Sequence, residues 1–418
     1  MTPRSALHLV RPVAFAFFGL LAAAAPVLAQ AEARQTQEDD YTRYELQAPG
    51  SGKFLILYEV TATTPGRPFF FNTIRKGSVA TDESVIDVAT GEELKMEVVG
   101  GAQAQKEGHP SAALDTDYIK VHLRQPVPEG GQVRLLIIKT YEDAKSYYRD
   151  GNAIVFDRSL GIRRNSVVLP KGYRLAGLNV PSQIMPTEDG RVMISFMNPG
   201  PGAAPLVIRA EPGLQPFTPG DATEARPPAA GRAGGDPERA HDAREAVYDL
   251  GDPAAHAFQL QHDYTEGRLG ASQYFDVVPD GATVASPSAT SLDTGEPLKV
   301  DVFTGGELER RGLVPGAPVA AGARVVVVSF APVPRNGSTR LRVHEAFTDP
   351  VRYKVDAGTL AFDAALAAPR ATVVLPAGWS VVASPTPVLV STRPDGRQQL
   401  YFENLRPGEL PVAIRARQ

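Results

Sequence analysis

Histidine offers the first test for chemistry, because imidazole serves as a metal ligand and as a general base near neutral pH. The chain holds seven histidines. The stretch HEAFT from His344 begins like the zinc-peptidase motif HExxH, but Thr348 stands where the second histidine is required. That motif places two histidines on one face of a helix, so one histidine alone cannot form its zinc site. HEAFT also falls in a predicted strand, and the sequence therefore predicts no zinc-peptidase centre.

His256 and His262 are the histidines closest together in the chain, and Asp263 follows directly. They flank the predicted strand AFQLQHDY, and a metal site there would need further ligands from elsewhere in the chain. A repeat described below places Gly52 and Tyr58 at the matching positions of the first half. We interpret the pair as surface histidines on a strand and its turn. No metal site and no cofactor are predicted.

Carboxylates are plentiful, and two of them in a cleft would suffice for a glycosidase. Three aspartates of the first half are matched by three of the second: Asp143, Asp150 and Asp157, and Asp349, Asp356 and Asp363. Their recurrence fits a turn role, since aspartate hydrogen-bonds to nearby backbone in loops. The sequence contains no G-x-S-x-G nucleophile elbow, no Walker-type phosphate loop and no dinucleotide fingerprint. We therefore predict no catalytic residues.

Arginines distinguish one stretch of the first half from its counterpart. Arg158 and Arg163 are matched by alanine and proline in the second half, whereas Arg164 is matched by another arginine. We expect these arginines on a loop near Tyr148. Guanidinium groups bind carboxylates, phosphates and acidic sugars, and an aromatic ring beside them can stack on a ligand. The candidate ligand-binding residues are therefore Arg158, Arg163, Arg164 and Tyr148. The alternative is a solvated loop whose charges keep an edge strand from pairing with neighbours.

The N-terminal residues follow the pattern of a secretory signal peptide. Two arginines precede an apolar run that ends near Leu28, and small residues stand at the positions needed for cleavage after Ala29. We expect residues 1–29 to be removed and the mature protein to be periplasmic or secreted. An uncleaved membrane anchor is the alternative, because the run approaches spanning length. After cleavage, no further integral membrane span is expected.

Composition excludes two further classes. The chain contains no cysteine, so disulfides and thiolate metal ligands are excluded. Its formal net charge is −4 over 418 residues. Such a weak charge creates no field that would capture nucleic acid, so we predict no nucleic-acid partner.

The chain repeats itself. TGEELKMEV from Thr90 recurs as TGEPLKVDV from Thr294, and PVPEGGQVRL from Pro126 recurs as PVPRNGSTRL from Pro332. Further matches follow in the same order, which indicates two copies of one unit. In the matching decapeptides, proline ends a strand and glycine permits the turn, so the phrase recurs because the turn geometry recurs.

Three segments follow the predicted signal peptide: copies over 41–211 and 245–418, and a linker over 212–244. The linker is rich in Pro, Gly and Ala as far as Gly235, and such a composition cannot bury enough apolar surface to order itself. Its tail has the N-terminal signals of a short helix, with an aspartate followed by Pro237. We therefore predict a flexible tether that ends in a helical turn.

Each copy is predicted to consist of strands. Short runs rich in β-branched and aromatic residues alternate with turn clusters such as PEGG and RDGN. No long helical period appears. The predicted fold is all-β: two tandem copies of a β-sandwich unit joined by a flexible linker, each copy being one large antiparallel sandwich or two small ones.

These features together favour an exported, non-catalytic binding or scaffolding protein of the bacterial cell envelope, which presents loops of two modules to an envelope protein or an anionic glycan. The alternative is a carboxylate-dependent hydrolase that acts on polysaccharide at a sandwich rim. A convergent cluster of acids on a concave face would favour the hydrolase, and acids scattered over turns would favour the binding protein. A third possibility is an accessory module that has lost its catalytic neighbour.

Overall fold

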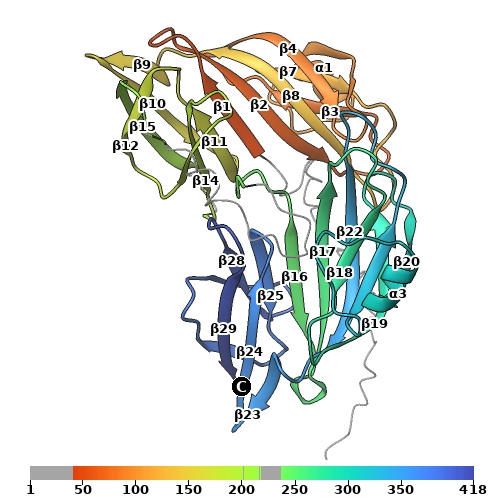
Figure 1. The fold of residues 1–418 in the computed structure, drawn as a ribbon. Helices are drawn as coiled ribbons and strands as arrows, with labels where there is room; N and C mark the ends of the chain where they lie inside the picture. Colours follow the sequence, from red (N-terminus) through yellow and green to blue (C-terminus); the bar gives the residue numbers. More distant parts are fainter. Residues whose placement is uncertain (1–40, 201, 216, 218–236) are drawn as a thin grey trace, which may run out of the picture. The chain divides into compact units, whose positions relative to one another are not determined.

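The computed structural model describes residues 41–200, 202–215, 217 and 237–418. The predicted signal peptide and most of the predicted linker lie outside the described residues. Contacts group the described residues as one compact unit. The described part consists mainly of β-strands (Figure 1), which confirms the predicted all-β class.

Helices are few and short in the described part of the chain. They are α1 (Gly101–Lys106), α3 (Gly305–Arg310) and the 3-10 turn η1 (Pro253–Ala255). Within these described ranges, no helix has both the length and the apolar character that a membrane crossing requires.

The strands of the first half are β1 (Tyr41–Leu46), β2 (Lys53–Ala62), β3 (Phe69–Thr73), β4 (Val79–Asp87), β5 (Glu92–Glu93), β6 (Met96–Gly100), β7 (Asp117–His122), β8 (Val133–Glu142), β9 (Tyr147–Asp150), β10 (Ala153–Leu160), β11 (Arg164–Val168), β12 (Tyr173–Leu178), β13 (Gln183–Pro186), β14 (Val192–Met197) and β15 (Ala204–Pro212). Those of the second half are β16 (Glu245–Leu250), β17 (Ala257–Glu266), β18 (Gln273–Val277), β19 (Thr283–Ser291), β20 (Pro297–Thr304), β21 (Arg324–Ser329), β22 (Thr339–Thr348), β23 (Tyr353–Asp356), β24 (Thr359–Leu366), β25 (Arg370–Val374), β26 (Ser380–Ala383), β27 (Leu389–Thr392), β28 (Gln398–Glu403) and β29 (Leu410–Arg417).

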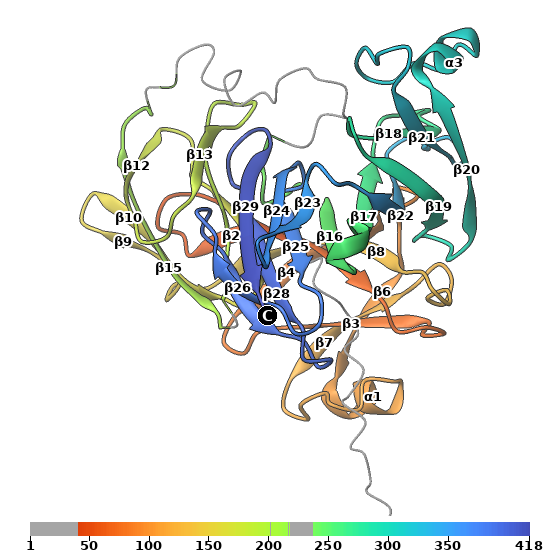
Figure 2. The same ribbon diagram turned by 90° about the horizontal axis from the view of Figure 1, so that it is seen from below.

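The first half forms an eight-stranded sheet (β13-β14-β11-β1-β2-β8-β4-β5), a four-stranded sheet (β12-β15-β10-β9) and a three-stranded sheet (β3-β7-β6). The second half forms a ten-stranded sheet (β18-β21-β20-β19-β22-β17-β16-β25-β28-β27) and the four-stranded sheet β23-β24-β29-β26, which can be followed in Figure 2. Most paired strands are antiparallel, as predicted, but β1 pairs with β11 and β16 with β25 in parallel.

Each half has two main apolar cores that share its longest strands. In the first half, Phe54 of β2 packs with Phe156 of β10, whereas Val60, further along β2, packs with Ile119 of β7. The strand β17 does the same in the second half, where it contributes Phe258 to one core and Tyr264 to another. Burial alternates at the start of β2, as expected when side chains point to the two faces of a strand in turn, but Val60, Thr61 and Ala62 at its end are all buried. Each half therefore contains two pairs of packed layers, and the longest strands belong to both pairs.

Strand pairing in the second half follows that in the first. Tyr58 of β2 pairs with Ile137 of β8, and His262 of β17 pairs with Val343 of β22, which are the positions matched by the sequence repeat. A register shift interrupts β4 and β19 at matching places as well. Each position of one half can therefore be compared with its counterpart in the other.

The recurring decapeptides lie where the two halves touch. Gln132 donates its backbone N–H to the carbonyl of Leu292 (2.6 Å), and the matching Ser338 donates to the carbonyl of Val88 (3.1 Å). A Cβ added to Gly337 would come within 2.3 Å of a carbonyl oxygen of the first half. The two contacts are reciprocal, as in a two-fold interface. The recurring turn therefore joins the halves in addition to ending a strand.

Residues 237–244, the tail of the predicted linker, form a segment that we call the strap. The predicted short helix is wrong over residues 237–244, which form bends and a turn followed by residues without regular secondary structure. Glu238, Arg239 and Asp242 are only 4–5% exposed. Glu238 binds side chains of the first half and Arg239 binds backbone carbonyls of the second half, and these contacts outweigh the local helix signals.

Candidate functional site

The structure does not place Arg158 on a solvated loop, and that prediction is wrong. Arg158 lies on β10, is 7% exposed and forms an ion pair with Asp143 (3.1 Å). Its guanidinium also lies 5.3 Å from the centre of the Phe54 ring. Arg158 belongs to the inward face of β10 because it follows Phe156 by two residues. The Arg158 charge is therefore paired with a carboxylate inside the first half.

Tyr148 is separated from Arg158 by the alternation of the strand. It lies on β9, is 36% exposed and pairs in register with Val155 of β10. Because Val155 and Arg158 are an odd number of residues apart, their side chains point to opposite faces. Arg163 is partly buried between strands, and its guanidinium lies 5.2 Å from the centre of the Tyr401 ring of the second half. These three residues do not form one site.

Arg164 binds the strap. It is 2% exposed and donates to the carbonyl oxygens of Ala240 (2.9 Å) and His241 (3.3 Å). Its counterpart Arg370 does the same one step further along, donating to the carbonyl of Asp242 (3.0 Å). The arginine that recurs in both halves is therefore structural, and it holds the strap from each side.

Side chains of the strap also bind residues of both halves. The Glu238 carboxylate accepts hydrogen bonds from the hydroxyls of Tyr41 (2.6 Å) and Ser195 (2.8 Å) of the first half. Burial and the nearby Glu238 charge raise the pKa of Tyr41 well above its ordinary value. Arg239 donates to the carbonyl of Asn404 (3.1 Å) in the second half. The strap thus links the halves through buried, charge-assisted hydrogen bonds.

A cleft of about 420 Å³ opens beside the strap. Its walls come from β2 and β8 of the first half, from the strap, and from β17 and β22 of the second half. Charged side chains are frequent in these walls: Arg134, Arg164, Arg244, Arg268 and Arg340, with Glu59, Asp242 and Glu266. Five arginines therefore line a cavity of the size that holds small ligands or a side-chain cluster of a partner.

Ion pairs order these arginines. Arg268 forms a two-pronged contact with Glu266 (3.0 and 2.7 Å), and Arg244 forms one with Asp242 (3.0 and 2.7 Å). Burial would raise the pKa of Glu266, but the hydrogen bonds from Arg268 outweigh it and the pKa is lowered. The Arg268 side chain remains 65% exposed. Since a guanidinium has five N–H donors, an arginine paired in this way still has donors for a ligand.

Two of the six recurring aspartates bind the backbone of turns, which is the role predicted for all six. The other four lie within strands: Asp150, Asp157, Asp356 and Asp363. Asp143 accepts hydrogen bonds from the backbone N–H groups of Lys145 (3.1 Å) and Ser146 (3.2 Å). Asp349, its counterpart, accepts them from Val351 (3.1 Å) and from the residue after it. These carboxylates stabilise loops, and Asp349 also lines a cavity of about 370 Å³ together with Asp276, Asp280 and Glu409.

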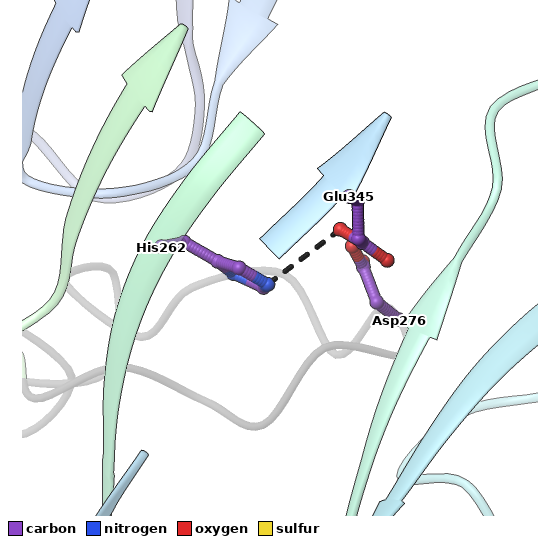
Figure 3. Close-up of side chains that lie close together, drawn as sticks. All are labelled: His262, Asp276 and Glu345. Carbon is purple, nitrogen blue, oxygen red and sulfur yellow. Dashed lines mark ion pairs between the residues drawn. The ribbon is translucent and has the colours of Figure 1, made fainter. Parts of the chain in front are cut away.

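A second cluster joins His262 to two carboxylates that sequence reasoning missed. His262 of β17, Asp276 of β18 and Glu345 of β22 point toward one another (Figure 3), and one ligand atom from each lies within 4.8 Å of the others. The Nε2 atom of His262 lies 3.7 Å from Oε2 of Glu345. His262 is half-buried, so its assignment to the surface is wrong. No spacing in the sequence joins these three residues, because they come from three strands.

Burial differs across this cluster. The Glu345 side chain is 0% exposed and that of His262 is 15% exposed. His262 and Asp276 line a small cavity of about 90 Å³, together with Tyr274. The Tyr274 hydroxyl lies 3.2 Å from Nδ1 of His262. The imidazole is thus oriented with its other nitrogen toward Glu345. His256, the other histidine of the pair considered in the sequence, lies outside this cluster, and its Nδ1 contacts the carbonyl oxygen of Tyr353 (2.9 Å).

Comparisons with known proteins add little. No family model and no curated protein matches the sequence. Among solved structures, the crystal structure of an aminopeptidase N family protein from Idiomarina loihiensis is similar over 41% of this chain, with 13% identity and a TM-score of 0.25. This chain covers 29% of that protein's length. A similarity this low carries no argument about function, so the site must be interpreted from its own residues.

Proposed function

We propose that the protein is an exported, non-catalytic binding protein of the bacterial cell envelope, which binds acidic groups of an envelope protein or an anionic glycan in the cleft beside the strap. The observation that carries the proposal is the set of five arginines around a cavity of about 420 Å³. Export is supported by the signal-peptide pattern of residues 1–29.

Guanidinium groups favour this class of ligand. They are always charged, and their planar donors match carboxylates, sulfates and phosphates. Arg244 and Arg268 are each held by a carboxylate, so their orientation is set before a ligand arrives. Such preorganisation lowers the entropy lost on binding. A ligand with several acidic groups could bridge these arginines.

The wall of the cleft also includes Arg134, which is held from the second half. It donates to the Asp293 carboxylate (3.0 Å) and to the hydroxyl and carbonyl of Ser338 (2.8 Å each). Both halves therefore contribute to the cleft, and a ligand bound there would add to the contacts between them.

Binding of a polyanionic glycan tests the proposal. We expect polygalacturonate to bind the mature protein and neutral dextran not to, with an affinity that falls steeply as salt is added. The double variant Arg268→Gln/Glu266→Gln removes one guanidinium while keeping the local charge balanced, and should weaken binding about tenfold, which corresponds to roughly 1.4 kcal/mol.

The matched control is Arg174→Gln/Glu211→Gln, which removes an exposed ion pair of the same kind (2.7 Å) on β12 and β15. It should leave binding unchanged. Equal affinity of both double variants would contradict the proposal. Release of shortened saccharides during the incubation would instead favour the carboxylate-dependent hydrolase.

A further inference from the structure

We propose that His262, Asp276 and Glu345 bind a divalent transition-metal ion within the second half. This inference does not depend on the proposed function, since none of the three residues lines the arginine-lined cleft. One imidazole nitrogen and two carboxylate oxygens form a mixed ligand set that suits ions such as Zn²⁺ or Mn²⁺ better than Ca²⁺, which takes six or more oxygens.

The strands bring these ligands together in a defined way. His262 pairs with Val343 in the β17·β22 ladder, and Glu345 lies two residues beyond Val343. The two side chains are therefore diagonal neighbours on one face of the sheet. Asp276 comes from β18, at the far end of the same sheet order, and approaches them from another direction (Figure 3). Three rigid strands, rather than a loop, thus hold the three ligands.

The spacing of the ligand atoms is close to that of a coordinated ion. Two ligands of a tetrahedral Zn²⁺ stand about 3.4 Å apart, since each bond is about 2.1 Å long. The Nε2–Oε2 separation is 3.7 Å, and no pair in the cluster exceeds 4.8 Å. Small rotations of the Asp276 and Glu345 side chains would close the difference. The adjoining cavity leaves room for a water molecule at a further coordination position.

Tyr274 orients the His262 ring through the ring nitrogen that does not face Glu345. Its hydroxyl lies 3.2 Å from Nδ1 of His262, and Tyr274 stands two residues before Asp276 on the same face of β18. Histidines that bind metals usually donate their second ring N–H to an outer partner, which fixes the tautomer and directs the free nitrogen at the ion. Tyr274 provides such a partner.

At the matching place of the first half, a lysine supplies a positive charge, and this comparison is a second argument for the proposal. The counterparts of Asp276 and Glu345 are Asn72 and Lys139, as the strand registers show. Lys139 is 5% exposed, and its ammonium donates a hydrogen bond to the side-chain Oδ1 of Asn72. In the first half, then, a buried ammonium occupies the region where the second half places two carboxylates.

The charged groups of the two places differ. In the first half the ammonium of Lys139 lies near the carboxylate of Glu83. In the second half Pro287 stands at the position of Glu83, and the carboxylates of Asp276 and Glu345 lie beside His262. A cation stabilises a carboxylate that is as buried as Glu345, which is 1% exposed. A bound divalent ion would add positive charge at this place, as the lysine does in the first half.

Zinc titration of the full mature chain tests the proposal. After treatment with a chelator, the wild type should bind one Zn²⁺ per chain in competition with a chromophoric chelator, and its melting temperature should rise. Glu345→Gln keeps the shape of the side chain but removes a ligand charge, and should weaken binding roughly 100-fold or more. The control His344→Gln removes an exposed histidine next to Glu345 and should bind as the wild type does.

A triple variant gives the second half the residues of the first. His262→Tyr, Asp276→Asn and Glu345→Lys should leave a folded chain, judged by far-UV circular dichroism, that binds no Zn²⁺ and gains no thermal stability from it. If Glu345→Gln fails to fold, this variant carries the test. Absence of one-to-one binding by the wild type, undiminished binding by Glu345→Gln or the triple variant, or loss of binding in His344→Gln would overturn the proposal.

Discussion

Replacement of Lys139 by methionine should stabilise the protein at neutral pH and remove a pH dependence. Lys139 lies on β8 and is 5% exposed. Burial, offset in part by Glu83, lowers its pKa from 10.5 to about 8. Methionine fills a similar volume without a charge, so Lys139→Met removes the cost of burying the ammonium while the apolar stem is kept.

The size of the effect follows from the pKa. A change from 10.5 to about 8 corresponds to about 3 kcal/mol of destabilisation when the amine is charged in both states. The lost hydrogen bond to Asn72 offsets about 1 kcal/mol of the gain. We therefore expect Lys139→Met to raise the free energy of unfolding by roughly 2 kcal/mol at pH 7.

The sign of the pH dependence is fixed by proton binding. Between pH 8 and about 10.5 the folded chain binds fewer protons at Lys139 than the unfolded chain does, so the stability of the wild type rises with pH in that window. Below pH 8 the cost is present in full. From pH 7 to pH 9 the advantage of the variant over the wild type should shrink by roughly 1 kcal/mol.

Urea unfolding followed by far-UV circular dichroism at pH 7, 8 and 9 measures this difference. All other titrating groups are common to both proteins and cancel in the comparison. Lys53→Met, which removes a 48% exposed lysine from β2, should show no such pH-dependent difference. A difference between Lys139→Met and the wild type that stays constant from pH 7 to pH 9 would refute the reasoning.

Three further outcomes follow from the fold. Gly295 and Gly270 both have φ near +75°, but a Cβ on Gly295 would lie 2.1 Å from the carbonyl oxygen of Glu129, whereas a Cβ on Gly270 would meet open space. Urea unfolding should show that Gly270→Ala lowers the free energy of unfolding by about 1 kcal/mol and that Gly295→Ala lowers it by at least about 2 kcal/mol more. Arg164→Met removes two hydrogen bonds to the strap and should cost roughly 3 kcal/mol by the same assay, and an unchanged midpoint would contradict its structural role. Limited proteolysis should cut first within 212–235, as its composition predicts, and the fragments should stay together in gel filtration because the strap and the recurring turns join the halves; separate elution would show that these contacts are weak.

The general features of the fold could be predicted because they depend on local pattern. Alternating apolar residues and turn clusters indicate strands wherever the chain folds, and the β-rich structure agrees. The turn role of Asp143 and Asp349 was also predictable, since an aspartate side chain binds the backbone two or three residues away. The helix expected from Pro237 onward is not formed, because contacts of Glu238 and Arg239 with residues far away in the sequence outweigh a weak local preference.

The sequence by itself determined the strands, the recurring order of segments and the identity of the residues that differ between the halves. Only the tertiary structure decided which of the residues that differ between the halves lie close together. Alternation along a strand shows that Arg158 and Phe156 share a face, but whether that face is covered depends on the opposite layer, and here it is covered and Arg158 is buried. In the same way, the exchange of Lys139 and Asn72 for Glu345 and Asp276 is visible in the aligned sequence. That these two carboxylates converge on His262 depends on how β18 reaches β17 and β22, and contacts between distant strands are set by the packing of whole layers rather than by any local spacing.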